Sequence, residues 1–187
     1  MATNIDEPVL TVDHLDLMPD DGNRYELLEG EIYVSRAPGL THQRVIGNIY
    51  LTLRLYLETT PIGEVLSTPG VIFDQFNGVI PDLVFISNEL KDRIGTGEKI
   101  TEAPELMIEI VSPGKENAER DRLVKRRVYA KHGVKEYWVA DPEARTLEIY
   151  RLKHRSLALV ATLAGKDEIT TPLLPGFACT VNQIFNS

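Results

Sequence analysis

The sequence has a single cysteine, no long apolar run and few aromatic residues, and each scarcity excludes a class of protein. Cys179 has no second cysteine to pair with, so an internal disulfide is excluded, and we expect a protein of the reducing cytoplasm. No apolar run approaches the roughly 18 to 20 residues of a membrane-spanning helix, so no membrane association is expected. Met1 to Asp16 lacks the basic and apolar regions of a secretory signal.

The composition is that of a globular protein with one core. Apolar residues make up 43% and charged residues 26% of the 187 positions, so we expect one domain over 1–187 with its core at about 24–152. The net charge of -8 argues against a basic nucleic-acid coat. However, Lys115 to Lys135 holds eight lysines and arginines against three acids, which is either a solvated helix face or a surface for an anionic partner.

The hydrophobic pattern alternates between strand and helix periods. We expect two short strands around a Glu29-Gly30 turn in Arg24 to Ser35, and an amphipathic helix in His42 to Glu58 with Thr41 as its N-cap. The further expected elements are strands in Glu64 to Asp74, Val79 to Ser87 and Leu106 to Val111, a polar loop in Asn88 to Ala103, a helix in Asn117 to His132 ended by Gly133, and strands in Lys135 to Ala140 and Thr146 to Leu152. This order predicts an α/β fold with helices packed on a mixed sheet.

One carboxylate interrupts an apolar strand. Glu109 lies in the run Leu106 to Val111, which is otherwise aliphatic, with Pro104 before it and Ser112-Pro113-Gly114 after it. Because side chains alternate along a strand, Glu109 should share its face with Met107 and Val111. A buried, ionised carboxylate costs several kcal/mol unless it has a partner, so we looked for a cation, a metal ligand or a second acid.

Two segments offer such partners. Asp82 directly follows Pro81 at the start of another apolar strand, where it either caps a turn or supplies a second acid. On the helix after the Glu109 strand, a rotation of about 100° per residue puts Asp121, Lys125 and Tyr129 on or beside the face of Val124 and Val128. Lys125 therefore either reaches solvent along the sheet or reaches Glu109.

Two carboxylates and a lysine match the needs of metal-assisted phosphodiester hydrolysis. Carboxylate oxygens are suited to Mg²⁺, which polarises a phosphate and lowers the pKa of the attacking water, and an ammonium group stabilises the developing charge. Asp82 and Glu109 are the candidate metal ligands, and Lys125 is the candidate catalytic cation. A metal-independent hydrolase that uses Glu109 and Asp82 as an acid/base pair is an alternative, against which the 7% aromatic content argues because sugar-binding surfaces are rich in aromatics.

The motif order is Asp82 in IPDLVFIS, Glu109 27 residues later in PELMIEIVSP, and then DRLVKRRVYAKHGVKEYWVADP. It resembles the PD-(D/E)XK nuclease superfamily and is more closely similar to the Uma-type family of putative restriction endonucleases. The similarity also covers RYELLEGEIYV, THQRVIGNIYLTL, LEIYRL and LLPGFACTVNQIF, which is nearly the whole chain.

The resemblance implies a restriction-endonuclease-like mixed sheet flanked by helices, with an extra N-terminal hairpin and C-terminal strands. It implies a DNA endonuclease that uses Mg²⁺, or Mn²⁺ as a substitute, and a homodimer. Asp82 and Glu109 match the metal ligands of the superfamily, but Val111 stands where its lysine is expected. Lys125 fits branches in which the basic group lies on the following helix, with Asp121 and Tyr129 positioning it. A nuclease fold that has lost activity and binds a partner is the alternative that Val111 keeps open.

Five further positions have weaker signals. Glu31 and Glu26 in the first hairpin are candidates for an additional acid, although exposed hairpin charges are common. His42 begins its helix on the side of Ile46 and is either a capping residue or a member of the site. Arg122 and Arg126 on the basic helix are candidates for phosphate contacts.

Overall fold

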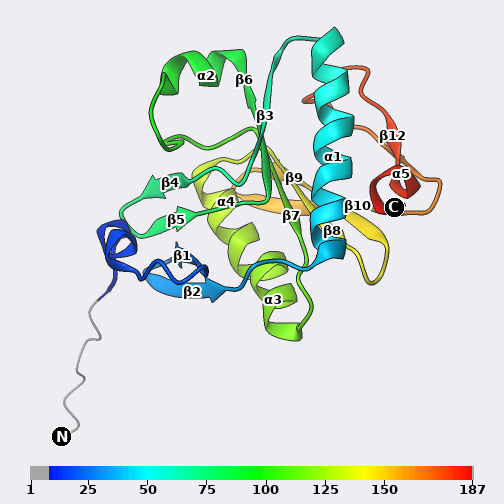
Figure 1. Cartoon of the computed structure of the whole chain (residues 1–187). Coiled ribbons are helices and arrows are strands. Elements are labelled where there is room, and N and C mark those ends of the chain that lie inside the picture. Colours follow the sequence, from blue (N-terminus) through cyan, green and yellow to red (C-terminus); the bar gives the residue numbers. More distant parts are fainter. Residues whose placement is uncertain (1–8, 187) are drawn as a thin grey trace, which may run out of the picture.

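A six-stranded mixed sheet forms the centre of the structure, a computed structural model that describes residues 9–186 (Figure 1). Its strands lie in the order β10-β9-β8-β7-β6-β3. They are β3 (Gly63–Ser67), β6 (Leu83–Ser87), β7 (Leu106–Ile110), β8 (Glu136–Asp141), β9 (Thr146–Lys153) and β10 (Ser156–Ala164). Only β7 and β8 are parallel, and a parallel pair needs a crossover connection, which here is helical. The predicted α/β class with a mixed sheet is confirmed.

A second, antiparallel sheet has the strand order β2-β1-β5-β4. Its strands are β1 (Arg24–Leu28), β2 (Glu31–Ser35), β4 (Val71–Asp74) and β5 (Asn77–Val79), and a short 3₁₀ helix (Val12–Leu17) precedes it. The predicted N-terminal hairpin is confirmed, with Glu29 and Gly30 at φ 54° and 84° in its turn. The C-terminal part adds the short pair β11 (Glu168–Ile169) and β12 (Cys179–Thr180), followed by helix α5 (Val181–Phe185).

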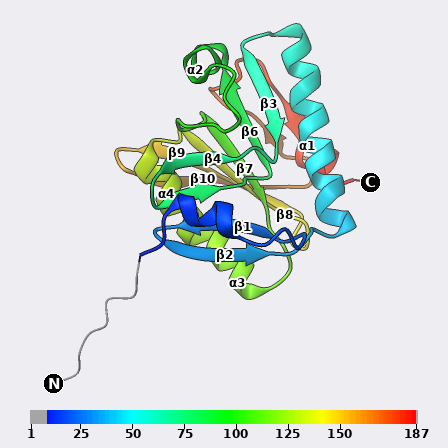
Figure 2. The same cartoon turned by 60° about the vertical axis from the view of Figure 1, so that its left-hand side comes forward.

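Helices cover the two faces of the six-stranded sheet (Figure 1, Figure 2). On one face, Ile46, Ile49 and Leu53 of α1 (Leu40–Thr59) pack with α5 against Leu106, Ile108 and Ile110 of β7. On the other face, Val128 and Tyr129 pack against Met107 of the same strand. The alternation along β7 is therefore as predicted, and Glu109 faces the second helical layer.

The second layer is one continuous run of helix, here called the crossover helix. It consists of α3 (Lys115–Glu119), a π-helical segment (Arg120–Lys125) and α4 (Arg126–His132), and it ends at Gly133 in the left-handed conformation with φ 89°. The helix and its glycine terminator were predicted, but the π-helical segment was not. Such widened turns occur often at functional sites.

Three local predictions were wrong. The segment Asn88 to Ala103 is not all loop, because α2 (Asn88–Ile94) begins after Ser87, whose side chain accepts the N–H of Leu90. Helix α1 begins at Leu40 with Gly39 as its N-cap rather than Thr41. Glu64 to Asp74 is not one strand, because the chain turns at Thr68 with φ 51° and passes from one sheet to the other.

Across residues 9–186, the structure contains no helix with the length and apolarity that crossing a bilayer requires.

Candidate active site

Four carboxylates meet where β1, β6, β7 and the crossover helix converge. Glu26, Asp82, Glu109 and Asp121 are each at most 4% exposed, and all four line one small cavity. The antiparallel register of β6 and β7 pairs Leu83 with Ile108, so Asp82 directly before β6 lies opposite Glu109. We call these four side chains the carboxylate cluster.

Lys125 lies inside the carboxylate cluster. Its Nζ atom is 2.9 Å from Glu109 Oε1, 3.0 Å from Glu26 Oε1 and 4.0 Å from Asp121 Oδ1, and the residue is 2% exposed. Burial alone would lower the pKa of Lys125, but Glu109, Glu26 and Asp121 outweigh it and raise this pKa. The ammonium therefore stays charged at neutral pH.

Glu109 is the carboxyl whose protonation is most strongly affected. Burial raises its pKa to about 8, Lys125 opposes the shift, and the charges of Asp82, Glu26 and Asp121 add to it. Tyr129 donates its hydroxyl hydrogen to Glu109 Oε1 at 2.8 Å, and burial together with Glu109 raises the pKa of Tyr129 well above its usual value. The glutamate thus receives two strong donors on one oxygen.

The pKa of Asp82 is shifted in the opposite direction to that of Glu109. Burial alone would raise its pKa, but hydrogen bonding and charge from His42, the N–H of Ile110 and the charge of Lys125 hold that pKa below its usual value. The Ile110 N–H donates to Asp82 Oδ2 at 2.8 Å, and His42 Nε2 lies 3.2 Å from the same oxygen. The site therefore pairs an acid that ionises easily with one that resists ionisation.

The π-helical segment explains how one helix supplies three site residues. A regular α-helix rotates by about 100° per residue, which would turn Asp121 and Tyr129 apart by about 80°. A π turn holds more residues, so Asp121 and Lys125 both point at the sheet and are both buried. Tyr129 one turn later is also fully buried, while Leu123 between them is 55% exposed.

The donor set suits a hard divalent cation. Asp82 and Glu109 face each other as oxygen donors, and Mg²⁺ is usually bound by one or two carboxylates together with water and substrate phosphate. Within residues 9–186, no three histidine, cysteine, aspartate or glutamate side chains are grouped so that they alone would enclose a metal ion. A cation held here would therefore need water or phosphate as further ligands.

Of the two hairpin glutamates named from the sequence, the structure brings only Glu26 to the site. Glu26 lies in the carboxylate cluster and accepts the Ile80 N–H at 2.9 Å. Glu31 does not, because it is exposed on β2 and accepts the Tyr33 hydroxyl at 3.1 Å. His42 does reach the cluster through Asp82, and its Nδ1 atom is buried without a hydrogen-bond partner among residues 9–186.

The two arginines named for phosphate contacts lie outside the cluster's cavity. Arg122 donates to Asp141 Oδ2 at 2.8 Å and to Glu148 Oε1 at 2.9 Å, and Arg126 lies over the ring of Tyr150 at 5.0 Å.

Other arginines that the sequence did not single out line the cavity instead. They are Arg24, Arg36 and Arg120. Arg24 stands two residues before Glu26 in β1, and strand alternation on that hairpin was the available signal for it. Arg120 lies next to Asp121 on the crossover helix, with its Nε 3.3 Å from Asp121 Oδ1.

Comparisons with known proteins identify a family and a similar fold. Residues 12–182 match the family model Uma2, described as putative restriction endonuclease. The structure is similar to the crystal structure of a putative nuclease belonging to DUF820 from Anabaena variabilis, with a TM-score of 0.76 and 17% sequence identity over 94% of this chain and 97% of that one. At that identity the likeness is one of fold. No curated protein matches the chain.

Proposed function

The chain belongs to the Uma2 family of putative restriction endonucleases, and from this premise we propose that it hydrolyses phosphodiester bonds of DNA as a metal-dependent endonuclease. The observation that carries the proposal is the contact of 2.9 Å between Lys125 Nζ and Glu109 Oε1. Val111 leaves the expected strand position without a lysine, yet the ammonium reaches the same acid from the crossover helix. A chain that had lost its activity would have no need to keep this buried set together.

Asp82 and Glu109 are the residues that would hold Mg²⁺ or Mn²⁺. Such a cation, when bound, polarises the phosphate and lowers the pKa of the attacking water. The ionised Asp82 offers a ready ligand, while Glu109 releases its proton as positive charge arrives. Glu26 and Asp121 are not needed as ligands in this arrangement, because both balance the charge of Lys125.

Lys125 has one donor left for the substrate. An ammonium group carries three N–H bonds, and the contacts with Glu109 and Glu26 use two of them. The third can orient the attacking water or stabilise the charge that develops on the phosphate. Because these two partners are on two different strands, β1 and β7, the ammonium is fixed in place before the substrate binds.

Arginines at the edge of the carboxylate cluster support phosphate binding. Arg24 Nη1 lies 3.5 Å from Asp82 Oδ1, and Arg36 is exposed beside it on the same cavity. No ion pair of Arg36 is found within residues 9–186. Its guanidinium is thus free to take a phosphate as a bidentate partner.

Plasmid cleavage tests the proposal. Supercoiled DNA is incubated with the purified protein and Mg²⁺, Mn²⁺ or a chelator, alongside Glu109→Ala and Lys125→Ala. Glu31→Ala, which changes an exposed glutamate of β2, and Lys131→Ala, which changes an exposed lysine of the crossover helix, serve as controls. We expect metal-dependent cutting by the wild type and both controls only.

The other outcomes are equally informative. Wild-type protein that cuts no faster than Glu109→Ala with any metal contradicts the nuclease proposal and leaves a binding module. Cutting that survives the chelator contradicts the metal dependence alone. Homodimerisation would let the enzyme cut both strands and stays a prediction, for which sedimentation with and without DNA is the measurement.

A further inference from the structure

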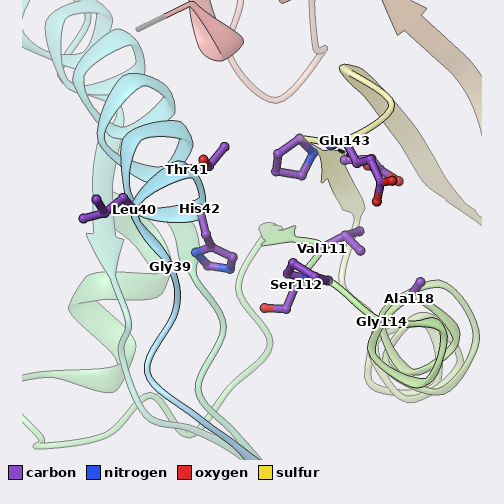
Figure 3. Close-up of a pocket in the computed structure, with 12 residues that line it drawn as sticks. Gly39, Leu40, Thr41, His42, Val111, Ser112, Gly114, Ala118 and Glu143 are labelled. Carbon is purple, nitrogen blue, oxygen red and sulfur yellow. Dashed lines mark hydrogen bonds between the residues drawn. The ribbon is translucent and has the colours of Figure 1, made fainter.

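A large pocket adjoins the carboxylate cluster and has no place in the chemistry described above. Its volume is 810 Å³, and it is lined by the first residues of α1, the segment after β7, Ala118 of the crossover helix and the turn between β8 and β9. Figure 3 shows Leu40, Thr41 and His42 on one side, Gly114 and Ala118 on the other, and Ser112 between them. The volume is in the range of pockets that hold small ligands.

The pocket is continuous with the candidate active site. His42 and Ser112 line both the pocket and the small cavity of the carboxylate cluster. A DNA strand whose phosphate lies at Asp82 and Glu109 therefore has its neighbouring nucleotide at the mouth of the pocket. This inference rests on the proposed nuclease function, since it assigns a second part of the same substrate.

The chemistry of the two spaces differs. Four cations, Arg24, Arg36, Arg120 and Lys125, line the cluster's cavity. Among the lining residues of the pocket that the structure describes, none is a lysine or arginine, and Asp141 and Glu143 are at its rim. The pocket is therefore a poor place for a phosphate.

Apolar groups make up much of the pocket wall. Val111, Pro113, Ala118 and Pro142 are among the lining residues. An apolar pocket that opens beside the candidate active site indicates a ligand with a flat or apolar surface. A nucleobase has such flat faces. Because all four bases have them, binding through these faces does not depend on the DNA sequence.

We propose that this pocket receives the base of the nucleotide next to the scissile phosphate, turned out of its stack. The substrate class that follows is single-stranded DNA, or duplex DNA with an unpaired nucleotide at the cleavage site. An intact duplex must first unstack and unpair that nucleotide, which costs a few kcal/mol and slows its cleavage.

The first test needs no variant. One oligonucleotide is offered to the full-length protein with Mg²⁺ or Mn²⁺ as a single strand, as a duplex and as a duplex with a one-nucleotide bulge. After the cleavage site is mapped, each flanking nucleotide is replaced in turn by an abasic analogue. We expect faster cutting of the single strand and the bulge, and a loss of about tenfold in kcat/KM at one abasic position next to the cut, since a base contact is worth about that factor.

Two variants locate the effect. Ala118→Leu fills the pocket, and its control Ala164→Leu makes the same change at an exposed strand end. Thr41→Phe narrows the pocket from the side of α1, and its control Leu51→Phe changes another exposed residue of that helix. We expect Ala118→Leu to lose about tenfold in kcat/KM on the intact strand and to become insensitive to the abasic replacement. Thr41→Phe should lose activity in the same way, and the controls should match the wild type.

The results separate the two proposals. If the wild type cuts no DNA of any form, the nuclease function fails and the base pocket fails with it. If it cuts, but no abasic position matters and both pocket variants behave as their controls do, the base pocket alone is overturned and another ligand occupies it. Thr41 is exposed, so its variant keeps the test decisive even if Ala118→Leu does not fold.

Discussion

Two buried glutamates on neighbouring strands of the same sheet are held in opposite ways. Glu136 on β8 is 1% exposed, and each of its oxygens has one donor, Trp138 Nε1 and Arg151 Nε, both at 2.7 Å. Glu109 on the parallel strand β7 is 4% exposed and shares its surroundings with three further acids. Glu136 has the one-to-one partners of a structural residue, whereas Glu109 has an excess of like charge.

The difference shows what a buried acid contributes besides stability. In the carboxylate cluster, four acids that are at most 4% exposed surround one equally buried cation, Lys125. Like charges in low dielectric repel each other, and another positive charge would relieve that repulsion. Arg24 and Arg120 contact Asp82 and Asp121 from less buried positions, whereas Glu109 keeps a pKa of about 8 despite its contact with Lys125. A bound cation would relieve the repulsion at Glu109, and a balanced acid such as Glu136 has no such repulsion to relieve.

The largest expected effect is the difference in plasmid-cutting rate between variants of Glu109 and Glu136. Glu109→Gln removes a charged ligand while keeping the shape, so we expect a loss of 10³-fold or more in the plasmid-cutting rate. Glu136→Gln should cut within a few-fold of the wild type, because this side chain touches neither the cluster nor its cavity. Rates of nicking at saturating Mg²⁺ measure both. Equal losses in the two variants would mean that Glu109, too, acts only through the fold.

Lys125 and Arg151 should also differ in their effect on the cleavage rate, although by a smaller factor than the two glutamates. Lys125→Met keeps the volume of the side chain but removes the ammonium, so we expect a loss of about 10²-fold in cutting, the effect of deleting one preorganised donor. Arg151→Met removes the partner of Glu136 and should leave cutting nearly unchanged. Single-turnover cleavage separates this loss from weaker DNA binding. A Lys125→Met protein that cuts at the wild-type rate contradicts the proposed role of the lysine.

Local patterns were enough to predict part of this comparison. The apolar run around Glu109 predicted a buried strand, alternation predicted the face, and the spacing of Asp121, Lys125 and Tyr129 predicted one helical side. These features depend on residues close in sequence, and the helix follows the strand directly. These patterns left Lys125 either at Glu109 or at the solvent, and the family resemblance favoured Glu109.

Distant contacts could not be predicted in this way. Lys125 and Glu26 are 99 residues apart, and nothing in the hairpin sequence favoured Glu26 over Glu31. The choice depends on how the second sheet packs against the crossover helix. The π-helical segment had no sequence signal either, since its residues are ordinary helix formers. A single domain, a homodimer and a cytoplasmic location stay predictions.

For protein stability the order of the two glutamates should be reversed, so that replacing Glu136 costs more than replacing Glu109. Glu136→Gln puts an amide N–H₂ where Arg151 or Trp138 needs an acceptor, so we expect the free energy of unfolding to fall by about 2 kcal/mol. Glu109→Gln removes one of four crowded negative charges and should cost less, or stabilise the fold at pH 8. Urea unfolding at pH 8 without metal measures both values. A larger loss for Glu109→Gln would show that its contact with Lys125 outweighs the repulsion.

The pH dependence of stability should also distinguish Glu109. Its pKa is about 8 in the folded protein against an ordinary value of 4.5, so between these values the folded state keeps a proton that the unfolded chain loses. The free energy of unfolding should then fall as pH rises from 5 to 8, by about 1 kcal/mol per pH unit. Asp121, whose pKa is also raised, adds in the same direction.

The contributions of Asp82 and Lys125 to stability do not change in this window. The lowered pKa of Asp82 stabilises the fold fully above its ordinary value of 3.8, and the raised pKa of Lys125 does so below 10.5. The difference in slope between wild type and Glu109→Gln therefore isolates Glu109, since all histidines are common to both. Mg²⁺ at pH 8 should raise the melting temperature of the wild type and not of the variant, because binding a cation there displaces the proton and relieves the repulsion among the four acids. Identical slopes in the two proteins would mean that Lys125 alone neutralises Glu109, and the contrast with Glu136 would then be one of geometry rather than of charge.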